Sequence, residues 1–254
     1  EWIVSFIAIT SIGGIAVPMN SWWTSTELEY GLKNCNAKLV IADAERLERI
    51  NFFKEKLSFE TITIRSDNNL ENDWDKISQK YINRKMPVID CNQNDDATIF
   101  YTSGSTGHPK GVCSSHRSII SALLQWMVVA TARNIKDGIV NDDTTQPSCL
   151  LTVPLFHVTG SHAQFMLSFL SGRKMVIMYK WSSEEALKLI EKEKITTLNG
   201  VRTMTLEVMR DKNRNNYDIS SLKELSGGGA ARPTTHVEEL KSQFPNASPG
   251  LGYG

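Results

Sequence analysis

The sequence has no excess of charge of either sign, since 28 basic residues balance 28 acidic ones. Such a chain lacks the net positive charge that favours nucleic acids or anionic membranes, so no nucleic-acid partner is predicted. Its four cysteines lie far apart and match no metal-binding spacing. They indicate reduced thiols in a cytosol-like compartment, with Cys113 and Cys149 in the core. The predicted location is cytoplasmic, with a peripheral membrane site or an organelle as the alternatives.

Charge is also missing from residues 2–26, a stretch long enough to span a bilayer. Gly13, Gly14, Pro18 and Asn20 interrupt it, and no basic segment precedes it as in a signal peptide. We therefore predict a buried helix, a Gly-Gly turn and a strand, and no transmembrane segment. The predicted helix is already under way at Glu1, and the sequence ends directly after a predicted strand. Both features indicate truncation.

Internal repeats and low-complexity tracts are absent, and strands alternate with helices instead. The predicted strands are 38–43, 59–66, 97–100, 149–156, 174–180, 195–201, 222–228 and 248–254. The predicted helices after residue 149 are 161–172, 182–194, 203–210 and 234–244, while 67–95 is a loop with one short helix. This alternation is typical of parallel strands joined by right-handed crossovers, and hence of an α/β domain.

The segment YTSGSTGHPKGV, residues 101–112, joins a predicted strand to a predicted helix. Hydroxyl side chains and glycines surround a single cation, Lys110, so hydroxyl and backbone N–H donors can approach an anion closely. These small residues are Ser103, Ser105, Thr106, Gly104, Gly107 and Gly111. The composition fits a phosphate-binding loop, and it also fits a flexible connection.

The surroundings of this segment favour a phosphate. No Asp or Glu occurs in residues 97–136, which contain four basic residues. The helix expected from about Ser115 would point its positive end back toward the loop. The Gly-Lys-Ser/Thr of a Walker A loop and the Gly-x-Gly-x-x-Gly of dinucleotide-binding loops are both absent, so neither motif explains the segment.

YTSGSTGHPKGV resembles, nearly residue for residue, the phosphate-loop signature of the adenylate-forming enzymes. This superfamily includes acyl-CoA synthetases, firefly luciferase and the adenylation domains of nonribosomal peptide synthetases. VPLFHVTG (153–160), GGGAA (227–231) and GYG (252–254) resemble three further motifs of the family, in the same order and spacing. The chain is most similar to fatty-acid and related acyl-CoA synthetases, and the resemblance covers essentially its whole length.

The resemblance implies an α/β fold of layered sheets with flanking helices, as in the N-terminal domain of acyl-CoA synthetases, truncated at both ends. Residues 1–254 would be a partial N-terminal AMP-binding (adenylation) domain, with the C-terminal domain absent. The implied reaction is ATP-dependent activation of a carboxylic acid to an acyl-adenylate, followed by transfer to coenzyme A. The implied small-molecule partners are the acid, ATP and coenzyme A, with Mg²⁺ bound by a residue beyond this chain.

The resemblance also assigns roles to residues. The expected ligands of the β- and γ-phosphates are Thr102, Ser103, Gly104, Ser105, Thr106, Gly107 and Lys110. The expected adenine site consists of Gly228, Gly229, Ala230 and Ala231, with Tyr253 stacked on the base and Gly254 beside it. His157 would border the acyl pocket, and Lys110 would neutralise the departing pyrophosphate. These two are the predicted catalytic residues, and no metal ligand is predicted within the chain.

Each of these residues has a structural alternative. A histidine after an apolar strand, such as His157, is often an ordinary strand-end residue. The glycines at 227–229 would also serve a plain strand-to-helix turn, and Tyr253 a core. His162 and His236 are predicted to be structural.

The sequence also departs from the family. The Thr and Glu expected after Gly254, the ribose-binding Asp and the C-terminal catalytic Lys are not among these 254 residues. The fragment alone is therefore predicted to be inactive. Arg202 stands where the family usually has Pro.

Acidic residues are missing again from residues 149–183, where an amino acid adenylation domain would place the partner of its substrate's ammonium group. The segment offers apolar side chains instead: Leu155, Phe156, Val158, Phe165, Met166, Phe169 and Leu170. We therefore predict an acid without a free amine, most simply a fatty acid, with an aryl acid also compatible. The alternatives are an adenylation domain that loads a carrier protein and an inactive nucleotide-binding remnant.

Overall fold

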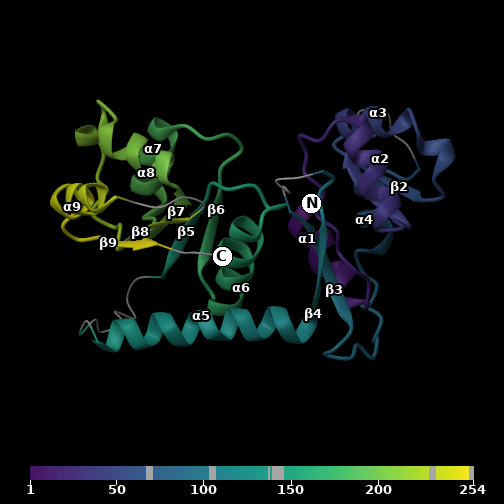
Figure 1. The fold of residues 1–254 in the computed structure, drawn as a ribbon, viewed down its shortest axis with the longest axis horizontal. Helices are drawn as coiled ribbons and strands as arrows, with labels where there is room; N and C mark the ends of the chain where they lie inside the picture. Colours follow the sequence, from purple (N-terminus) through teal and green to yellow (C-terminus); the bar gives the residue numbers. More distant parts are fainter. Residues whose placement is uncertain (67–70, 103–106, 137, 139–145, 229–232, 252–254) are drawn as a thin grey trace. The chain divides into compact units, whose positions relative to one another are not determined.

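The computed structural model of the chain describes residues 1–66, 71–102, 107–136, 138, 146–228 and 233–251. These residues form two compact units, Glu1–Ala122 and Leu123–Gly254, and each has its own sheets and helices (Figure 1). The helix α5 (His116–Lys136) begins in the first unit and continues into the second.

The first unit contains two small two-stranded sheets. Strands β1 (Leu39–Asp43) and β2 (Glu60–Ile64) are parallel, and β3 (Asp96–Tyr101) and β4 (Gly111–Ser115) form an antiparallel hairpin. The helices around them are α1 (Trp2–Ser11), α2 (Ser25–Asn34), α3 (Ala44–Asn51) and α4 (Trp74–Tyr81), with a 3₁₀ turn at Lys54–Lys56. A core of Trp23, Leu28, Leu32, Val40, Ile50 and Phe53 packs α2 and α3 onto β1.

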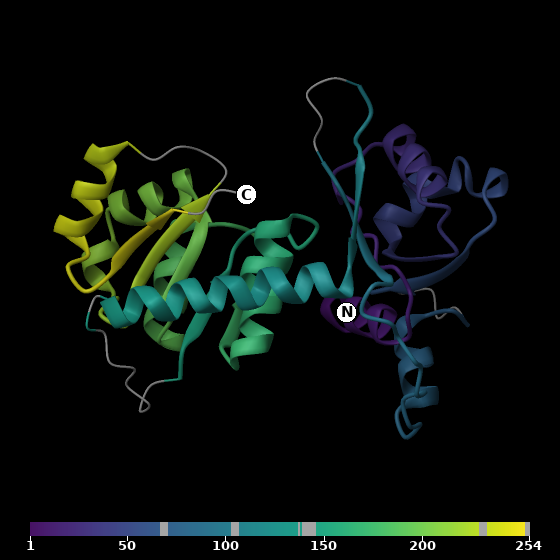
Figure 2. The ribbon, with the colours of Figure 1, turned by 60° about the horizontal axis from the view of Figure 1, so that its bottom comes forward.

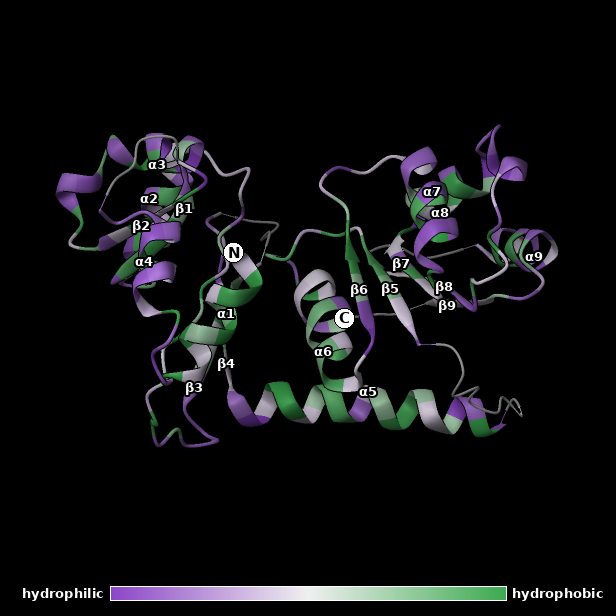
Figure 3. Ribbon diagram, turned by 180° about the vertical axis from the view of Figure 1, so that it is seen from behind, coloured by the Kyte–Doolittle hydropathy of each residue, from purple (hydrophilic) through white to green (hydrophobic). Residues whose placement is uncertain are grey.

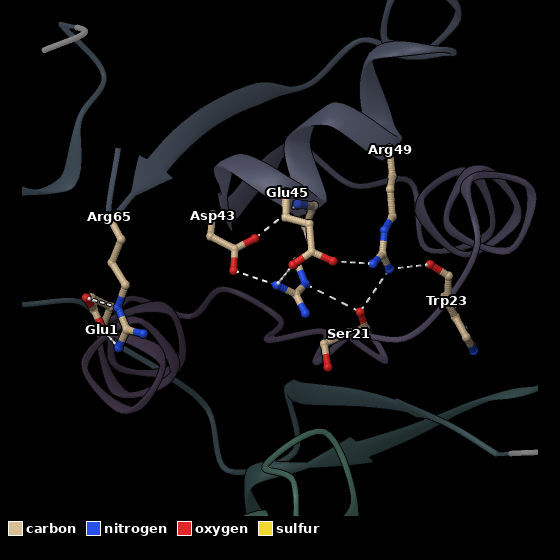
Figure 4. Close-up of polar contacts among 8 residues, drawn as sticks. Glu1, Ser21, Trp23, Asp43, Glu45, Arg49 and Arg65 are labelled. Carbon is tan, nitrogen blue, oxygen red and sulfur yellow. Dashed lines mark hydrogen bonds and ion pairs between the residues drawn. The ribbon is translucent and has the colours of Figure 1, made fainter. Parts of the chain in front are cut away.

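Local polar contacts fix where the helices of this unit begin. Thr24 and Glu27 form a capping box at the start of α2, and the Asp43 carboxylate accepts from the backbone N–H of Arg46 at the start of α3. Figure 4 shows Arg49 donating to the backbone carbonyls of Ser21 and Trp23, which ties α3 to the segment before α2. Local contacts therefore fix the starts of α2 and α3, and Arg49 anchors α3 to the chain before α2.

The second unit contains a five-stranded parallel sheet in the order β6-β5-β7-β8-β9. The strands are β5 (Ser148–Leu151), β6 (Lys174–Ile177), β7 (Thr197–Val201), β8 (Glu224–Gly228) and β9 (Ser248–Leu251). The connections contain a π-helix η2 (Thr159–Met166), α6 (Leu167–Ser171), α7 (Ser183–Glu193), α8 (Arg202–Arg210), a 3₁₀ turn (Arg214–Asn216) and α9 (Thr234–Gln243). The predicted alternation and parallel pairing are confirmed here.

Side-chain alternation divides the two faces of this sheet. Leu150, Leu198 and Leu225 join one core with residues of α7, α8 and α9, including Leu187, Val208 and Leu240. Figure 1 shows α7 and α8 next to each other over this sheet, and Figure 3 shows β5 and β6 becoming hydrophobic toward their ends. The fully buried Phe165 lies outside that core, on η2, which packs against β5. Helices therefore cover the central strands.

Several predicted details differ from the structure. Gly13 has a left-handed φ of 75°, as a turn requires, but the expected strand after it is only a single bridge between Ala16 and Thr98. The helix α1, which was predicted to be buried, buries only Ser5 and Phe6. Cys149 is buried as predicted, whereas Cys113 is exposed on β4, which among the described strands pairs only with β3.

One described helix, α5, is long and apolar enough to cross a membrane by length and composition alone. Core helices of soluble proteins meet the same criterion, so the helix is weak evidence for a membrane span.

Candidate functional site

The glycine- and serine-rich segment lies at the tip of the β3–β4 hairpin. Its described ends are close together, because the Thr102 N–H donates to the Lys110 carbonyl over 2.9 Å, and Tyr101 pairs with Gly111. Gly107 has a φ of 91°, a left-handed conformation that disfavours side chains, and a Cβ there would meet no atom of a described residue within 4 Å. The hairpin therefore holds both described ends of the loop.

Lys110 is held by its backbone and exposed at its side chain. No ion pair joins its ammonium group to another described residue. A cation that is fixed at its base and unpaired at its tip is suited to meet a polyphosphate.

The helix expected from about Ser115 begins at His116, but a strand separates it from the loop. Gly111, predicted to belong to the loop, opens β4, and α5 starts only at His116. Five residues of strand span roughly 17 Å, so the positive end of α5 lies at the far end of the hairpin from the loop, as Figure 2 shows. The expected contribution of the helix dipole to phosphate binding is therefore wrong, because the dipole acts only near its own terminus.

A residue of α2 supports the loop instead. The Tyr30 ring stacks on the His108 ring with 4.4 Å between centroids and 16° between planes. Its hydroxyl donates to the Pro109 carbonyl over 3.1 Å. Tyr30 thus contacts two consecutive residues of the loop immediately before Lys110. Sequence reasoning missed this residue, because Tyr30 and Pro109 are 79 positions apart and no local pattern connects them.

His157 belongs to the second unit and follows the carboxyl end of β5. Its N–H donates to the Pro154 carbonyl over 3.1 Å, which closes a turn, and its ring packs against Phe156 at 4.6 Å. The ring is on the surface, but partial burial lowers the pKa of His157. The predicted position after an apolar strand is confirmed, although β5 ends at Leu151 and a loop carries the histidine.

The π-helix after His157 is anchored by polar contacts. The His157 carbonyl accepts from the N–H of Ser161 over 2.9 Å and from its hydroxyl over 3.0 Å. The Ser161 oxygen also lies 2.9 Å from His162 Nδ1. Because the Ser161 proton is used on His157, the network assigns the His162 proton to Nδ1. His162 is buried, which agrees with its predicted structural role.

Acidification should weaken the fold through His162. Burial lowers the pKa of this histidine from 6.5 to about 4. The neutral side chain therefore contributes stability that is complete above about pH 6.5 and is lost as the pH falls toward 4. We expect the urea midpoint of the full-length protein to fall over this window, and to fall less in His162→Leu. His108→Leu, at an exposed histidine, is the control, and equal pH dependence in all three proteins would contradict the assignment.

Gly228 and Arg202, both singled out from the sequence, lie at the carboxyl ends of two neighbouring strands. Gly228 ends β8 and pairs with Val201 at the end of β7. Arg202 follows directly at the start of α8, and its Nε is buried without a hydrogen-bond partner among the described residues. Both residues lie at the carboxyl edge of the parallel sheet, where α/β folds bind ligands.

The remaining predicted site residues lie outside the described residues. These are Ser103, Gly104, Ser105, Thr106, Gly229, Ala230, Ala231, Tyr253 and Gly254. Within the described part of the chain, no group of three or more His, Cys, Asp or Glu side chains could hold a metal ion.

The whole chain, residues 1–254, matches the family described as AMP-binding enzyme. The 4-coumarate–CoA ligase 3 of Arabidopsis thaliana is 27% identical over 254 residues, which are 100% of this chain and 44% of that protein. The chain thus spans less than half the length of this relative.

Solved structures show the same fold. An anthranilate CoA ligase in complex with anthranoyl-AMP has a TM-score of 0.81 at 21% identity, over 100% of this chain and 48% of that one. The fatty acyl CoA synthetase of Mycobacterium tuberculosis also has a TM-score of 0.81 at 21% identity, over 100% and 47%. The predicted α/β architecture of layered sheets and flanking helices is confirmed by these similarities.

Proposed function

The chain belongs to the AMP-binding enzyme family, and from this premise we propose that the protein is an acid–thiol ligase that forms AMP. In the first step, a carboxylate oxygen attacks the α-phosphorus of ATP, and pyrophosphate leaves. In the second step, the thiolate of coenzyme A attacks the acyl carbonyl, and AMP leaves. The 254 residues are proposed to be part of the N-terminal adenylation domain, and the activity is proposed for the whole protein.

The observation that carries this proposal is the loop at the tip of the β3–β4 hairpin. Its backbone is closed by the Thr102–Lys110 hydrogen bond, and its lysine is exposed and without an ion pair among the described residues. A preorganised ammonium group stabilises the negative charge that develops on the departing pyrophosphate, because the site does not have to rearrange during the reaction. Holding the reactants in place supplies much of the remaining catalysis.

The other residues are proposed to bind the phosphates, the adenine or the acyl group. Thr102, Ser103, Gly104, Ser105, Thr106 and Gly107 are proposed to bind phosphate oxygens beside Lys110. Gly228 to Ala231, Tyr253 and Gly254 are proposed to form the adenine site. His157 is proposed to border the acyl group. Mg²⁺ would neutralise phosphate charge when bound, and its ligand is proposed to lie outside these residues.

The proposed substrate is a fatty or aryl carboxylic acid without a free amine. Residues 149–183 contain no Asp or Glu to pair with an ammonium group. Of the apolar residues predicted to line the pocket, Phe165 is fully buried in the fold, while Phe169 and Leu170 are exposed at the end of α6. Leu155, Phe156 and Val158, which flank His157, remain the best candidates for contact with the acyl group. The 4-coumarate–CoA ligase relatives favour an aryl acid, and the apolar side chains suit both classes.

Pyrophosphate exchange by the full-length protein tests this proposal. Fatty acids, aryl acids and the common amino acids are compared as substrates, and an acid without an amine is expected to be best. Within a homologous series, each buried methylene should improve binding by about 0.8 kcal/mol until the pocket is full. If an α-amino acid is the best substrate, an adenylation domain of the peptide synthetase type replaces the proposal. Absence of exchange with every acid would favour an inactive remnant.

A further inference from the structure

A buried glutamine links two neighbouring strands of the second unit at the point where their pairing stops. Gln164 lies in η2 and is fully buried. Its Oε1 accepts from the Thr152 N–H over 3.3 Å, and its Nε2 donates to the Asn199 carbonyl. Thr152 is the first residue after β5, and Asn199 lies in β7. Since an N–H only donates and a carbonyl only accepts, the two partners fix the orientation of the amide.

The same place has a third contact. The Thr152 hydroxyl donates to the Asn199 carbonyl over 3.1 Å, so this carbonyl accepts from both side chains. Leu151 and Asn199 are the last paired residues of β5 and β7. The amide therefore replaces the strand pairing at the point where it stops.

The loop that carries His157 starts and ends at this junction. It leaves β5 through Thr152 and returns through η2 to Gln164. Between these points, the His157 carbonyl is held by Ser161, and Gly160 packs against the carbonyls of Val153 and Pro154. A change at Gln164 therefore displaces one of the two ends that orient the loop.

A polar residue is a costly choice for this position. A buried amide requires both of its hydrogen bonds, whereas an apolar side chain of similar size would fill the same volume without that requirement. Unlike an apolar side chain, the amide fixes a direction and a distance between Thr152 and Asn199. Segments of π-helix are also frequent at functional sites.

We propose that Gln164 is a positioning residue for the acid-binding side of the site. It holds the His157 loop at a fixed distance from Asn199 of β7. This inference rests on the proposed function, and it adds a residue that acts through His157 and its neighbours rather than by touching the substrate.

The opposite end of the same strand pair provides a matched control. At the start of β5, the Ser148 N–H donates to Thr196 Oγ1 over 2.8 Å, and the Thr196 N–H donates to Ser148 Oγ over 3.0 Å. Thr196 Oγ1 also donates to the Ser148 carbonyl over 2.9 Å. Thr196→Val removes buried hydrogen bonds between the segments of β5 and β7, as Gln164→Met does, but at the edge away from His157.

The experiment compares Gln164→Met and Thr196→Val in the full-length protein, with the best acid found by pyrophosphate exchange. Both substitutions should lower the urea midpoint, because both leave buried groups unpaired. Only Gln164→Met should raise the KM for the acid, by about ten- to a hundredfold, with the KM for ATP changed less than about twofold. Equal changes in the acid KM for the two variants, or no change in Gln164→Met, would overturn the inference.

Gln164→Glu gives an independent readout if Gln164→Met does not fold. A neutral carboxyl can accept from Thr152 and donate to Asn199, whereas a carboxylate can only accept. The acid KM of this variant should therefore rise with pH relative to the parent protein, and a parallel pH profile would count against the positioning role. If the parent protein shows no exchange with any acid, the proposed function fails together with the inference. If the parent protein is active and Gln164→Met keeps the parent KM for the acid, only the inference fails.

Discussion

Replacement of Lys110 by alanine in the full-length protein should slow adenylate formation by about ten- to a hundredfold. A hydrogen bond to a charged group contributes about 1.5–3 kcal/mol, and each 1.4 kcal/mol of transition-state stabilisation is about a factor of ten in rate. If the ammonium group acts mainly on departing pyrophosphate, kcat and kcat/KM should fall together. Pyrophosphate exchange at varied ATP concentration measures both quantities.

The fold should be almost unaffected by this substitution. Lys110 is attached to the hairpin through its carbonyl, which accepts from Thr102, and alanine retains that carbonyl. The side chain is exposed, so its removal leaves no cavity. The urea midpoint is therefore expected to stay close to that of the parent protein.

Two variants make the Lys110 test specific. Lys110→Arg keeps the charge and should retain more activity than Lys110→Ala. Lys54→Ala removes an exposed cation of the same unit that lies outside the loop, and it should leave the rate unchanged. A large loss of stability in Lys110→Ala with normal ATP kinetics would show that the loop is structural.

The sequence predicted the sheet of the second unit because its signals are local. Apolar runs separated by amphipathic helices indicate parallel strands, and the boundaries have their own chemistry. Ser182 accepts from the Glu185 N–H at the start of α7, and Gly172 ends α6 with a left-handed φ of 66°. Each of these features depends on residues within a few positions of one another.

The candidate site was less predictable because its geometry depends on distant partners. Residues 111–115, Gly-Val-Cys-Ser-Ser, have a weak strand pattern of their own and become β4 only by pairing with β3. That pairing moves the start of α5 away from the loop. The contact of Tyr30 with His108 and Pro109 is equally non-local. Gln164 is a further case, because its partners Thr152 and Asn199 are 12 and 35 positions away and no local pattern marks it.

Replacement of Gly160 by alanine should disrupt the His157 loop. A Cβ at Gly160 would lie 2.3 Å from the Pro154 carbonyl oxygen and 2.7 Å from that of Val153. Both atoms belong to the backbone, so the contact is relieved only if the loop and η2 move apart. Overpacking of this kind costs about 1–3 kcal/mol, and the urea midpoint of the full-length protein should fall accordingly.

The movement should also affect substrate binding, because residues 153–160 include His157 and the apolar residues beside it. We expect the KM for the acid to rise in Gly160→Ala while the KM for ATP changes little. Gly200→Ala is the control for stability, since its Cβ would meet two side-chain atoms and no backbone atom, Met204 Sδ at 2.8 Å and Thr152 Oγ1 at 3.2 Å, and the Met204 side chain can rotate away. This control should lose less stability than Gly160→Ala. If the two variants lose equal stability, or if Gly160→Ala retains the parent acid KM, the close packing of Gly160 does not position the His157 loop.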